Sequence, residues 1–130
     1  MKYLLDTNTC IAFLKQRKSV VDRIELCSSP PVLCSIVKAE LLYGCYKSNQ
    51  RERNLALLID FFSTLPSLPF DDRAAEYYGQ LRAFLAHRGT PIGANDLLIA
   101  AIGLANELVL VTHNVGEFSR VPGLRLEDWE

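Results

Sequence analysis

The chain has 130 residues, of which 49% are hydrophobic and 22% are charged, and its formal net charge is -1. This length allows one domain with a substantial core, which we place at residues 1–130, and the composition is typical of a globular protein. The near-neutral charge excludes a strongly basic, non-specific nucleic-acid binder. Any contact with RNA or DNA therefore needs a local basic patch or metal ions.

The first half of the chain predicts short strands that alternate with helices. Strands are expected at 2–5 and 30–35, and helices at 9–17, 19–26, 36–48 and 49–65. Ser19 and Ser35 are the predicted N-caps of the second and third helices. The periodicity of the fourth helix places on one face the residues Leu55, Leu58, Ile59 and Phe62.

The second half continues this alternation, with strands expected at 66–70 and 108–112 and helices at 73–89 and 94–107. Asp71 or Asp72 caps the first of these helices, and Gly89 ends it. The second is apolar nearly all round, which predicts burial between layers. The C-terminal stretch predicts a turn of helix, a Pro-Gly turn and an edge strand. The whole pattern predicts an α/β sandwich with a short, mostly parallel sheet flanked by helices.

No signal peptide or membrane-spanning run is expected, because one lysine and only a short apolar segment precede Asp6. We therefore expect a cytoplasmic protein without membrane contact. His87 and His113 do not form zinc-binding spacings with the cysteines. Scattered cysteines in a cytosolic chain are usually buried, reduced thiols, so we expect the same here. The four cysteines are Cys10, Cys27, Cys34 and Cys45.

Four polar side chains stand where their neighbours favour burial. Asp6 follows the first strand, Asn114 follows the strand at 108–112, Asp96 begins an apolar helix, and Glu40 lies within one. Each has a local alternative: a turn for Asp6 or Asn114, the helix dipole for Asp96, an ion pair for Glu40. Ligands of parallel sheets bind at the carboxyl ends of strands. Acids gathered there would repel one another unless a divalent cation lay among them, and oxygen ligands suit Mg²⁺ or Mn²⁺.

Four segments, in this order and spacing, resemble the PIN-domain ribonucleases, specifically the VapC-type toxins of bacterial type II toxin–antitoxin pairs. The segments are LLDTNTCIAFL, KAELLYG, PIGANDLLIAA and LVLVTHNVGEFSRVPGLRLEDW. The resemblance covers the whole chain and implies a PIN-like three-layer sandwich. It also implies a metal-dependent endoribonuclease that hydrolyses RNA phosphodiester bonds and leaves a 3′-hydroxyl and a 5′-phosphate.

The resemblance assigns roles to individual residues. It implies that Asp6, Glu40 and Asp96 hold Mg²⁺ or Mn²⁺ and that, with Asn114, they form the catalytic set. Asn114 stands where the family often has Asp, so a second ion would be held less tightly. Two interpretations remain open for Glu117, nearby: a further acid of the cluster, or a plain surface turn of helix, which we favour. The residues expected to support the site are Thr7, Asn8 and Thr112.

The resemblance also implies partners: an RNA substrate, with transfer RNA as a family-level expectation, a cognate VapB-type antitoxin, and a second copy of the chain in a homodimer. Candidates for contacts with RNA phosphates are Lys15, Arg17, Lys18, Arg51 and Arg53. The apolar residues of the segments LLYGCY and LALLIDFF are candidates for the antitoxin groove or the dimer interface.

Two other functions fit parts of the sequence. A phosphatase of the haloacid dehalogenase type would use Asp6 as its nucleophile, but that pattern requires a second Asp where this chain has Asn8. A catalytically inactive PIN-fold module would bind RNA or a protein without cleaving, and Asn114 together with the near-neutral charge favours this alternative.

Overall fold

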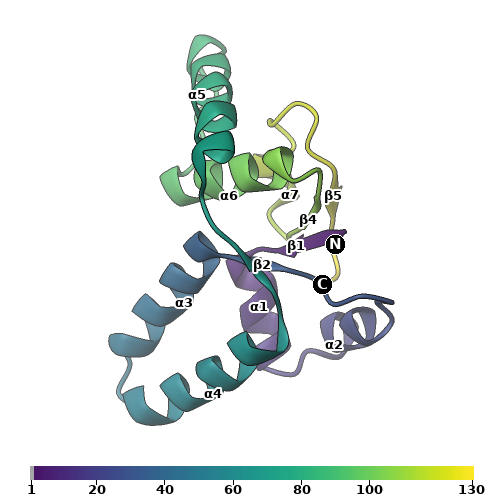
Figure 1. Cartoon of the computed structure of the whole chain (residues 1–130), viewed down its shortest axis with the longest axis vertical. Helices are drawn as coiled ribbons and strands as arrows, with labels where there is room; N and C mark the ends of the chain where they lie inside the picture. Colours follow the sequence, from purple (N-terminus) through teal and green to yellow (C-terminus); the bar gives the residue numbers. More distant parts are fainter. Residues whose placement is uncertain (1) are drawn as a thin grey trace.

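The computed structural model describes residues 2–130 and consists of short parallel strands flanked by helices (Figure 1). The strands are β1 (Tyr3–Leu5), β2 (Leu33–Cys34), β3 (Ser67–Leu68), β4 (Val109–Val111) and β5 (Leu126–Glu127). The helices are α1 (Thr7–Leu14), α2 (Lys18–Glu25), α3 (Ser35–Tyr46), α4 (Arg51–Thr64), α5 (Asp72–His87), α6 (Ala94–Ala105) and α7 (Val115–Phe118). The predicted α/β class is confirmed.

The strands pair in parallel, β1 with β4, β4 with β5, and β2 with β3. A parallel bridge between Leu4 and Val32 joins the two groups, so that the strand order is β3-β2-β1-β4-β5. Leu5 is opposite Val111 in the register of the central pair. The residues that follow β1 and β4 therefore emerge side by side at one edge of the sheet, as expected of parallel strands.

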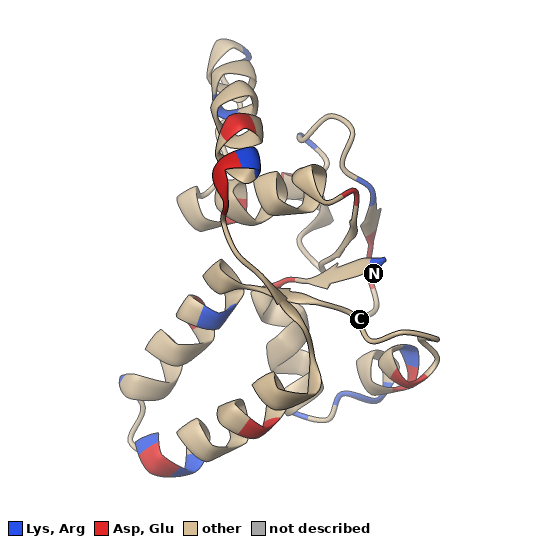
Figure 2. Ribbon diagram, viewed as in Figure 1, with Lys and Arg blue, Asp and Glu red and all other residues tan. Residues whose placement is uncertain are grey.

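Helices lie on both sides of the strands (Figure 1), with α5 and α6 packed together on one side and α1, α3 and α4 on the other. Helix α6 is buried along most of its length, from Leu97 to Ala105, which confirms its prediction as an internal helix. Lys, Arg, Asp and Glu lie mainly on the surrounding helices and loops (Figure 2). Within residues 2–130, no helix has both the length and the apolar character needed to cross a membrane.

Two of the predicted helix caps are wrong. Helix α2 begins at Lys18 after Arg17, one residue before Ser19, and α3 includes Ser35 as its first residue after Cys34. Neither helix has a side-chain capping bond at its start. Both helices leave directly from a segment fixed by other contacts, so a capping side chain is not required to begin them.

The buried face of α4 also differs from its prediction. Leu58 is buried as expected, but Ile59 is 59% exposed and Phe61 takes its place in the core. The ring of Phe61 stacks on that of Phe13 in α1, with 5.4 Å between ring centroids. Helix α4 has more apolar side chains than α1 and α3 can cover, so periodicity alone did not identify the covered face.

We expect Glu107→Gly to stabilise the protein by about 1 kcal/mol, because Glu107 has a φ of 54° just beyond the end of α6. This left-handed conformation is unfavourable for a side chain with a Cβ and is natural for glycine. The matched control is Glu76→Gly, which lies in α5 and should instead destabilise by about 1 kcal/mol. Urea denaturation measures both changes, and equal effects of the two would contradict the argument.

Candidate active site

Asp6 is the buried acid at the centre of the site. It follows β1 directly and is only 5% exposed. Its carboxylate Oδ1 accepts a hydrogen bond of 2.9 Å from the backbone N–H of Thr9, so Asp6 is the N-cap of α1. Its own N–H donates to the carbonyl of Val111 at 3.1 Å, and so does the Thr9 hydroxyl. These bonds fix Asp6 against the end of β4.

Glu40 reaches the same edge from α3. Its Oε1 accepts a hydrogen bond of 2.6 Å from the Thr7 hydroxyl, in the first turn of α1, and its Oε2 accepts one of 3.4 Å from the side-chain amide of Asn95. The local alternative, an ion pair on the solvent face, is not found among the ion pairs of residues 2–130. Two helices from opposite sides of the sheet therefore hold this carboxylate.

Asp96 and Glu117 form the third part of the site. Asp96 lies in the first turn of α6, whose N-cap is Gly93. Glu117 lies in the short helix α7 and accepts a hydrogen bond of 2.6 Å from the backbone N–H of Gly93. Glu117 thus lies on the predicted turn of helix and also beside Asp96, as the alternative interpretation expected. A Cβ built on Gly93 would meet Glu117 Oε1 at 3.5 Å and Asp96 Oδ2 at 3.6 Å, which shows how closely the two carboxyl groups approach there.

Asn114 is held at the carboxyl end of β4. Its backbone N–H donates to the hydroxyl of Thr112 at 3.0 Å, and its side-chain amide donates to Glu117 Oε2 at 3.0 Å. Thr112 is fully buried, so this hydroxyl is a fixed acceptor. Asn8 is exposed on α1 and lines an open pocket together with Asn114.

The crowding of these acids changes their pKa values. Burial, followed by the charges of Glu117 and Glu40, raises the pKa of Asp96 from 3.8 to about 6. The pKa of Glu117 is lowered, chiefly because the Gly93 N–H stabilises its charged form. At neutral pH the site therefore concentrates negative charge that its own hydrogen bonds offset only in part.

We expect Asp96→Asn to stabilise the cation-free protein at neutral pH. The folded chain retains a proton on Asp96 up to about pH 6, whereas an unfolded chain releases it near 3.8. Ionising Asp96 in the folded state therefore costs stability, and this cost grows between these two pH values and disappears below them. Because the carboxyl is partly exposed, we expect a gain of about 1 kcal/mol above pH 6 and none below about pH 4.

Urea denaturation in EDTA, carried out across this pH range, measures the difference between Asp96→Asn and the unchanged chain. The matched control is Asp60→Asn on α4, which is exposed and far from the other acids of the site. A gain in stability that does not depend on pH would contradict the role of charge crowding.

The donor set fits a hard divalent cation. Asp6, Glu40, Asp96 and Glu117 offer carboxylate oxygens, Asn114 offers an amide oxygen, and no cysteine or histidine ligand belongs to the group. Such oxygens suit Mg²⁺ or Mn²⁺, and a cation would relieve the repulsion that, after burial, raises the pKa of Asp96. Among residues 2–130, a tighter group of three ligand-type atoms, all within 4.8 Å of one another, belongs to His113, Asp128 and Glu130.

The structure thus brings together the four predicted catalytic residues. The expected supporting contacts are present for Thr7 and Thr112, while Asn8 stays a prediction. Sequence reasoning missed Thr9 and Asn95, and it did not favour the placement of Glu117 in the cluster. The spacing of Asn114 and Glu117 was a usable signal for the last of these, because residues three apart at the start of a helix lie on one face.

Comparison with known proteins agrees with this geometry. The PIN domain family model matches residues 3–124. The tRNA(fMet)-specific endonuclease VapC of Salmonella typhimurium is 45% identical over 130 residues, which cover 99% of this chain and 98% of that relative. Ribonuclease VapC2 of Rickettsia felis is 43% identical over 133 residues, which cover 100% of this chain and 99% of that relative.

Solved structures give the same result. The DNA-bound VapBC complex of Salmonella typhimurium contains a chain that superimposes with a TM-score of 0.96 at 45% identity, covering 100% of this chain and 99% of that one. A chain of the Rickettsia felis VapBC2 complex, bound to a DNA fragment from its promoter, has a TM-score of 0.95 at 41% identity, and both chains are covered fully. The chain therefore belongs to the PIN-domain family and, within it, to the VapC ribonucleases of toxin–antitoxin systems.

Proposed function

We propose that the chain is a toxin that cleaves transfer RNA by divalent-cation-dependent hydrolysis at the acid cluster. The single observation that carries this proposal is the convergence of Asp6, Glu40 and Asp96 at the carboxyl end of β1 and β4, with the pKa of Asp96 raised by burial and then by the neighbouring charges. The choice of transfer RNA rests on the name of the Salmonella relative.

Each residue of the site has its own role in hydrolysis. Mg²⁺ or Mn²⁺, held by Asp6, Asp96 and Glu40, would supply Lewis-acid stabilisation of the phosphate charge and lower the pKa of the attacking water. Glu40, oriented by the Thr7 hydroxyl, would accept a hydrogen bond from the attacking water. Glu117 fixes Asn114 and the start of α6 and so holds Asp96 in position.

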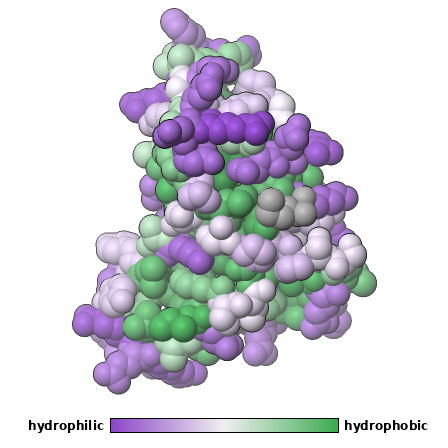
Figure 3. Space-filling model, viewed as in Figure 1, coloured by the Kyte–Doolittle hydropathy of each residue, from purple (hydrophilic) through white to green (hydrophobic). Residues whose placement is uncertain are grey.

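The partner that we propose for the apolar grooves is a VapB-type antitoxin segment, because the similar solved chains come from VapBC complexes. Two open grooves of about 570 and 430 Å³ lie beside α4, one towards α2 and one towards α3. Leu57 lines both grooves and is 54% exposed. Apolar side chains gather over the region of α3 and α4 in Figure 3.

A homodimer is a further part of the proposal. Tyr43 and Tyr46 on α3 are 67% and 50% exposed, and Phe84 on α5 is 39% exposed. Large apolar side chains that stay exposed on a helix surface, as the two tyrosines of α3 do, favour an interface. Because the proposed substrate is transfer RNA, we expect the protein to act in the cytoplasm.

The decisive experiment incubates the purified chain with total bacterial transfer RNA in the presence of Mg²⁺, Mn²⁺ or EDTA. Cleavage with either cation, lost in EDTA and absent for Asp96→Asn, is the expected result. The cut ends should be a 3′-hydroxyl and a 5′-phosphate, which end-specific ligation detects. Cleavage that survives EDTA would contradict the cation requirement, and no cleavage of any RNA would favour the inactive binding module.

A further inference from the structure

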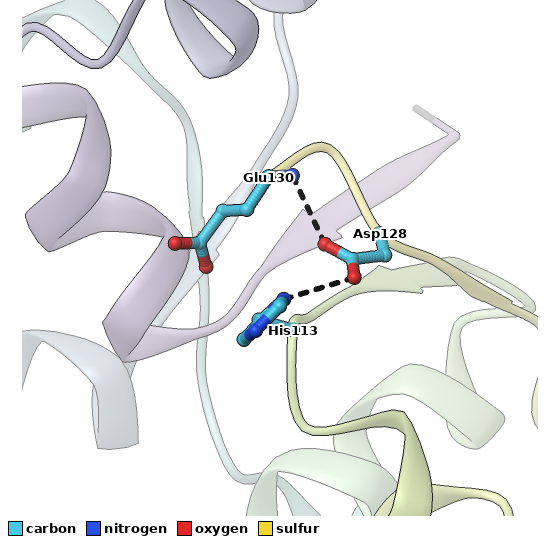
Figure 4. A group of neighbouring side chains, drawn as sticks. All are labelled: His113, Asp128 and Glu130. Carbon is cyan, nitrogen blue, oxygen red and sulfur yellow. Dashed lines mark hydrogen bonds and ion pairs between the residues drawn. The ribbon is translucent and has the colours of Figure 1, made fainter.

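A second polar cluster lies at the C-terminal end of the chain and consists of His113, Asp128 and Glu130 (Figure 4). The ring Nδ1 of His113 is 2.9 Å from Asp128 Oδ2, and Asp128 Oδ1 accepts a hydrogen bond of 3.0 Å from the backbone N–H of Glu130. Glu130 Oε1 in turn accepts a hydrogen bond of 3.2 Å from Arg17. Asp128 and Glu130 thus contact side chains from two distant parts of the chain. His113 follows β4, and Arg17 precedes α2.

The C-terminal tail that carries these carboxylates is itself firmly anchored. Trp129 is buried, and its ring meets that of Tyr3 edge to face, with 5.0 Å between centroids. Glu127 Oε1 accepts hydrogen bonds of 2.9 Å from both Trp129 and Arg23. Successive residues of an extended segment point to opposite sides, so a tail fixed by Glu127 and Trp129 presents Asp128 and Glu130 to the other side.

On that side lies an open pocket of about 730 Å³. It is lined by Asn8, Ile11, Ala12, Lys15, Arg17, His113, Asn114 and Glu130. Asn114 contacts Glu117 of the acid cluster, and Asn8 follows Asp6 by two positions, so the pocket lies next to the active site. Lys15 and Arg17 give it two positive charges against the single charge of Glu130, and the ring of His113 also lines it, with a second donor only in its protonated form.

We propose that this pocket is a subsite for an RNA phosphate next to the one that is cleaved, and that Asp128 and Glu130 are positioning residues for His113 and Arg17. The inference deepens the proposed function and rests on it for the identity of the ligand. A strand that runs from Asp6 past Asn114 would reach this pocket, where Lys15 and Arg17 offer its next phosphate donors of the right charge. Arg17 has further N–H groups besides the one given to Glu130, and these suit phosphate oxygens.

A divalent cation between His113, Asp128 and Glu130 is the competing occupant. Its support is the spacing of the three groups and one buried oxygen, Glu130 Oε2, that has no hydrogen-bond partner among the described residues. The guanidinium of Arg17 already neutralises Glu130, however, and Lys15 lines the same pocket. Within residues 2–130, Lys15 takes part in no ion pair. Its charge therefore favours an anion there over a second cation.

The test measures binding of a fluorescent single-stranded RNA of about ten nucleotides by anisotropy, in EDTA, over a series of salt concentrations. Arg17→Gln should weaken binding about tenfold and reduce the slope of log Kd against log salt by about 0.7, the value for one lost phosphate contact on a single strand. The matched control is Arg73→Gln, exposed on α5 away from the pocket, which should change neither quantity.

Asp128 gives a test of positioning that a simple charge effect does not reproduce. Asp128→Ala removes a negative charge and would tighten RNA binding through charge alone, whereas loss of the support for His113 should weaken it about fivefold. Asp128→Asn should restore binding, because its amide oxygen still accepts a hydrogen bond from the His113 ring. Thermal denaturation of each variant verifies that the tail remains folded.

The outcomes separate this inference from the proposed function. An Arg17→Gln variant that binds RNA like Arg73→Gln would overturn the subsite even if cleavage persists. Loss of Mn²⁺ affinity in His113→Asn, measured by calorimetry with RNA binding unchanged, would replace the subsite with a cation site. If the unchanged chain binds RNA with an Arg17-dependent salt slope but cleaves no RNA, the subsite stands and the proposed function fails.

Discussion

Replacing Asp6 by Asn is expected to abolish RNA cleavage while leaving the fold intact. The change removes the charge of the most buried acid in the site, and we expect cleavage to fall by about a thousandfold or more, equivalent to about 4 kcal/mol in the barrier. The cap of α1 should survive, because an Asn side-chain oxygen can still accept the hydrogen bond from the Thr9 N–H. Single-turnover cleavage of transfer RNA and thermal denaturation measure the two effects separately.

The chain contains a matched control for this experiment. Asp71 caps α5 as Asp6 caps α1, with Oδ1 accepting a hydrogen bond of 2.9 Å from the N–H of Ala74, but Asp71 lies outside the acid cluster. Asp71→Asn should keep both stability and cleavage. If the two variants cleave equally well, the assignment of Asp6 to the site is wrong. If Asp6→Asn unfolds and Asp71→Asn does not, Asp6 has a structural role that the cap does not explain.

The second large effect is expected from Thr7→Val, which changes no charge. Thr7 donates a hydrogen bond of 2.6 Å to Glu40, and valine has nearly the same shape without the hydroxyl. Groups that orient a metal-binding or catalytic carboxylate contribute about 10- to 100-fold to activity or metal affinity. We therefore expect kcat/KM for RNA cleavage to fall by about this factor, with a matching loss of Mn²⁺ affinity in calorimetry.

Thr64→Val is the control for Thr7→Val. Thr64 ends α4, and its hydroxyl donates to the backbone carbonyl of Phe61 within the same helix. This variant also exchanges a helical threonine hydroxyl for a methyl group but should leave cleavage unchanged. Unchanged cleavage in Thr7→Val would show that Asn95 alone suffices to orient Glu40.

The positions of Asp6 and Thr112 were predictable because both follow strands, and parallel strands bring their carboxyl ends together whatever else the chain does. Asp96 was predictable in part, because an acid at the start of a buried helix must lie near a layer boundary. Glu117 was not predictable in this way. Its place depends on a hydrogen bond to Gly93, 24 positions earlier, which only the packing of α7 against the start of α6 creates.

The errors in the helices have a related cause. Ser19 and Ser35 have the residue type preferred at N-caps, but α2 and α3 start from positions that tertiary contacts fix. In α4 the apolar periodicity was real, yet Ile59 and Leu57 remain exposed because the covered face depends on which helices pack there. Local patterns thus located the elements, while long-range contacts decided their ends, their faces and the full membership of the acid cluster.

Asp6 is both the cap of α1 and an acid of the site, so one mutation there would inactivate the protein without unfolding it. An aspartate codon becomes an asparagine codon through a single base transition, and the product would keep its fold and its apolar grooves. Such an escape mutant would be harmless by itself but would still sequester antitoxin. An inactivated copy of this kind would lower the amount of free antitoxin in the cell. An intact copy that shares the same antitoxin would then be more toxic.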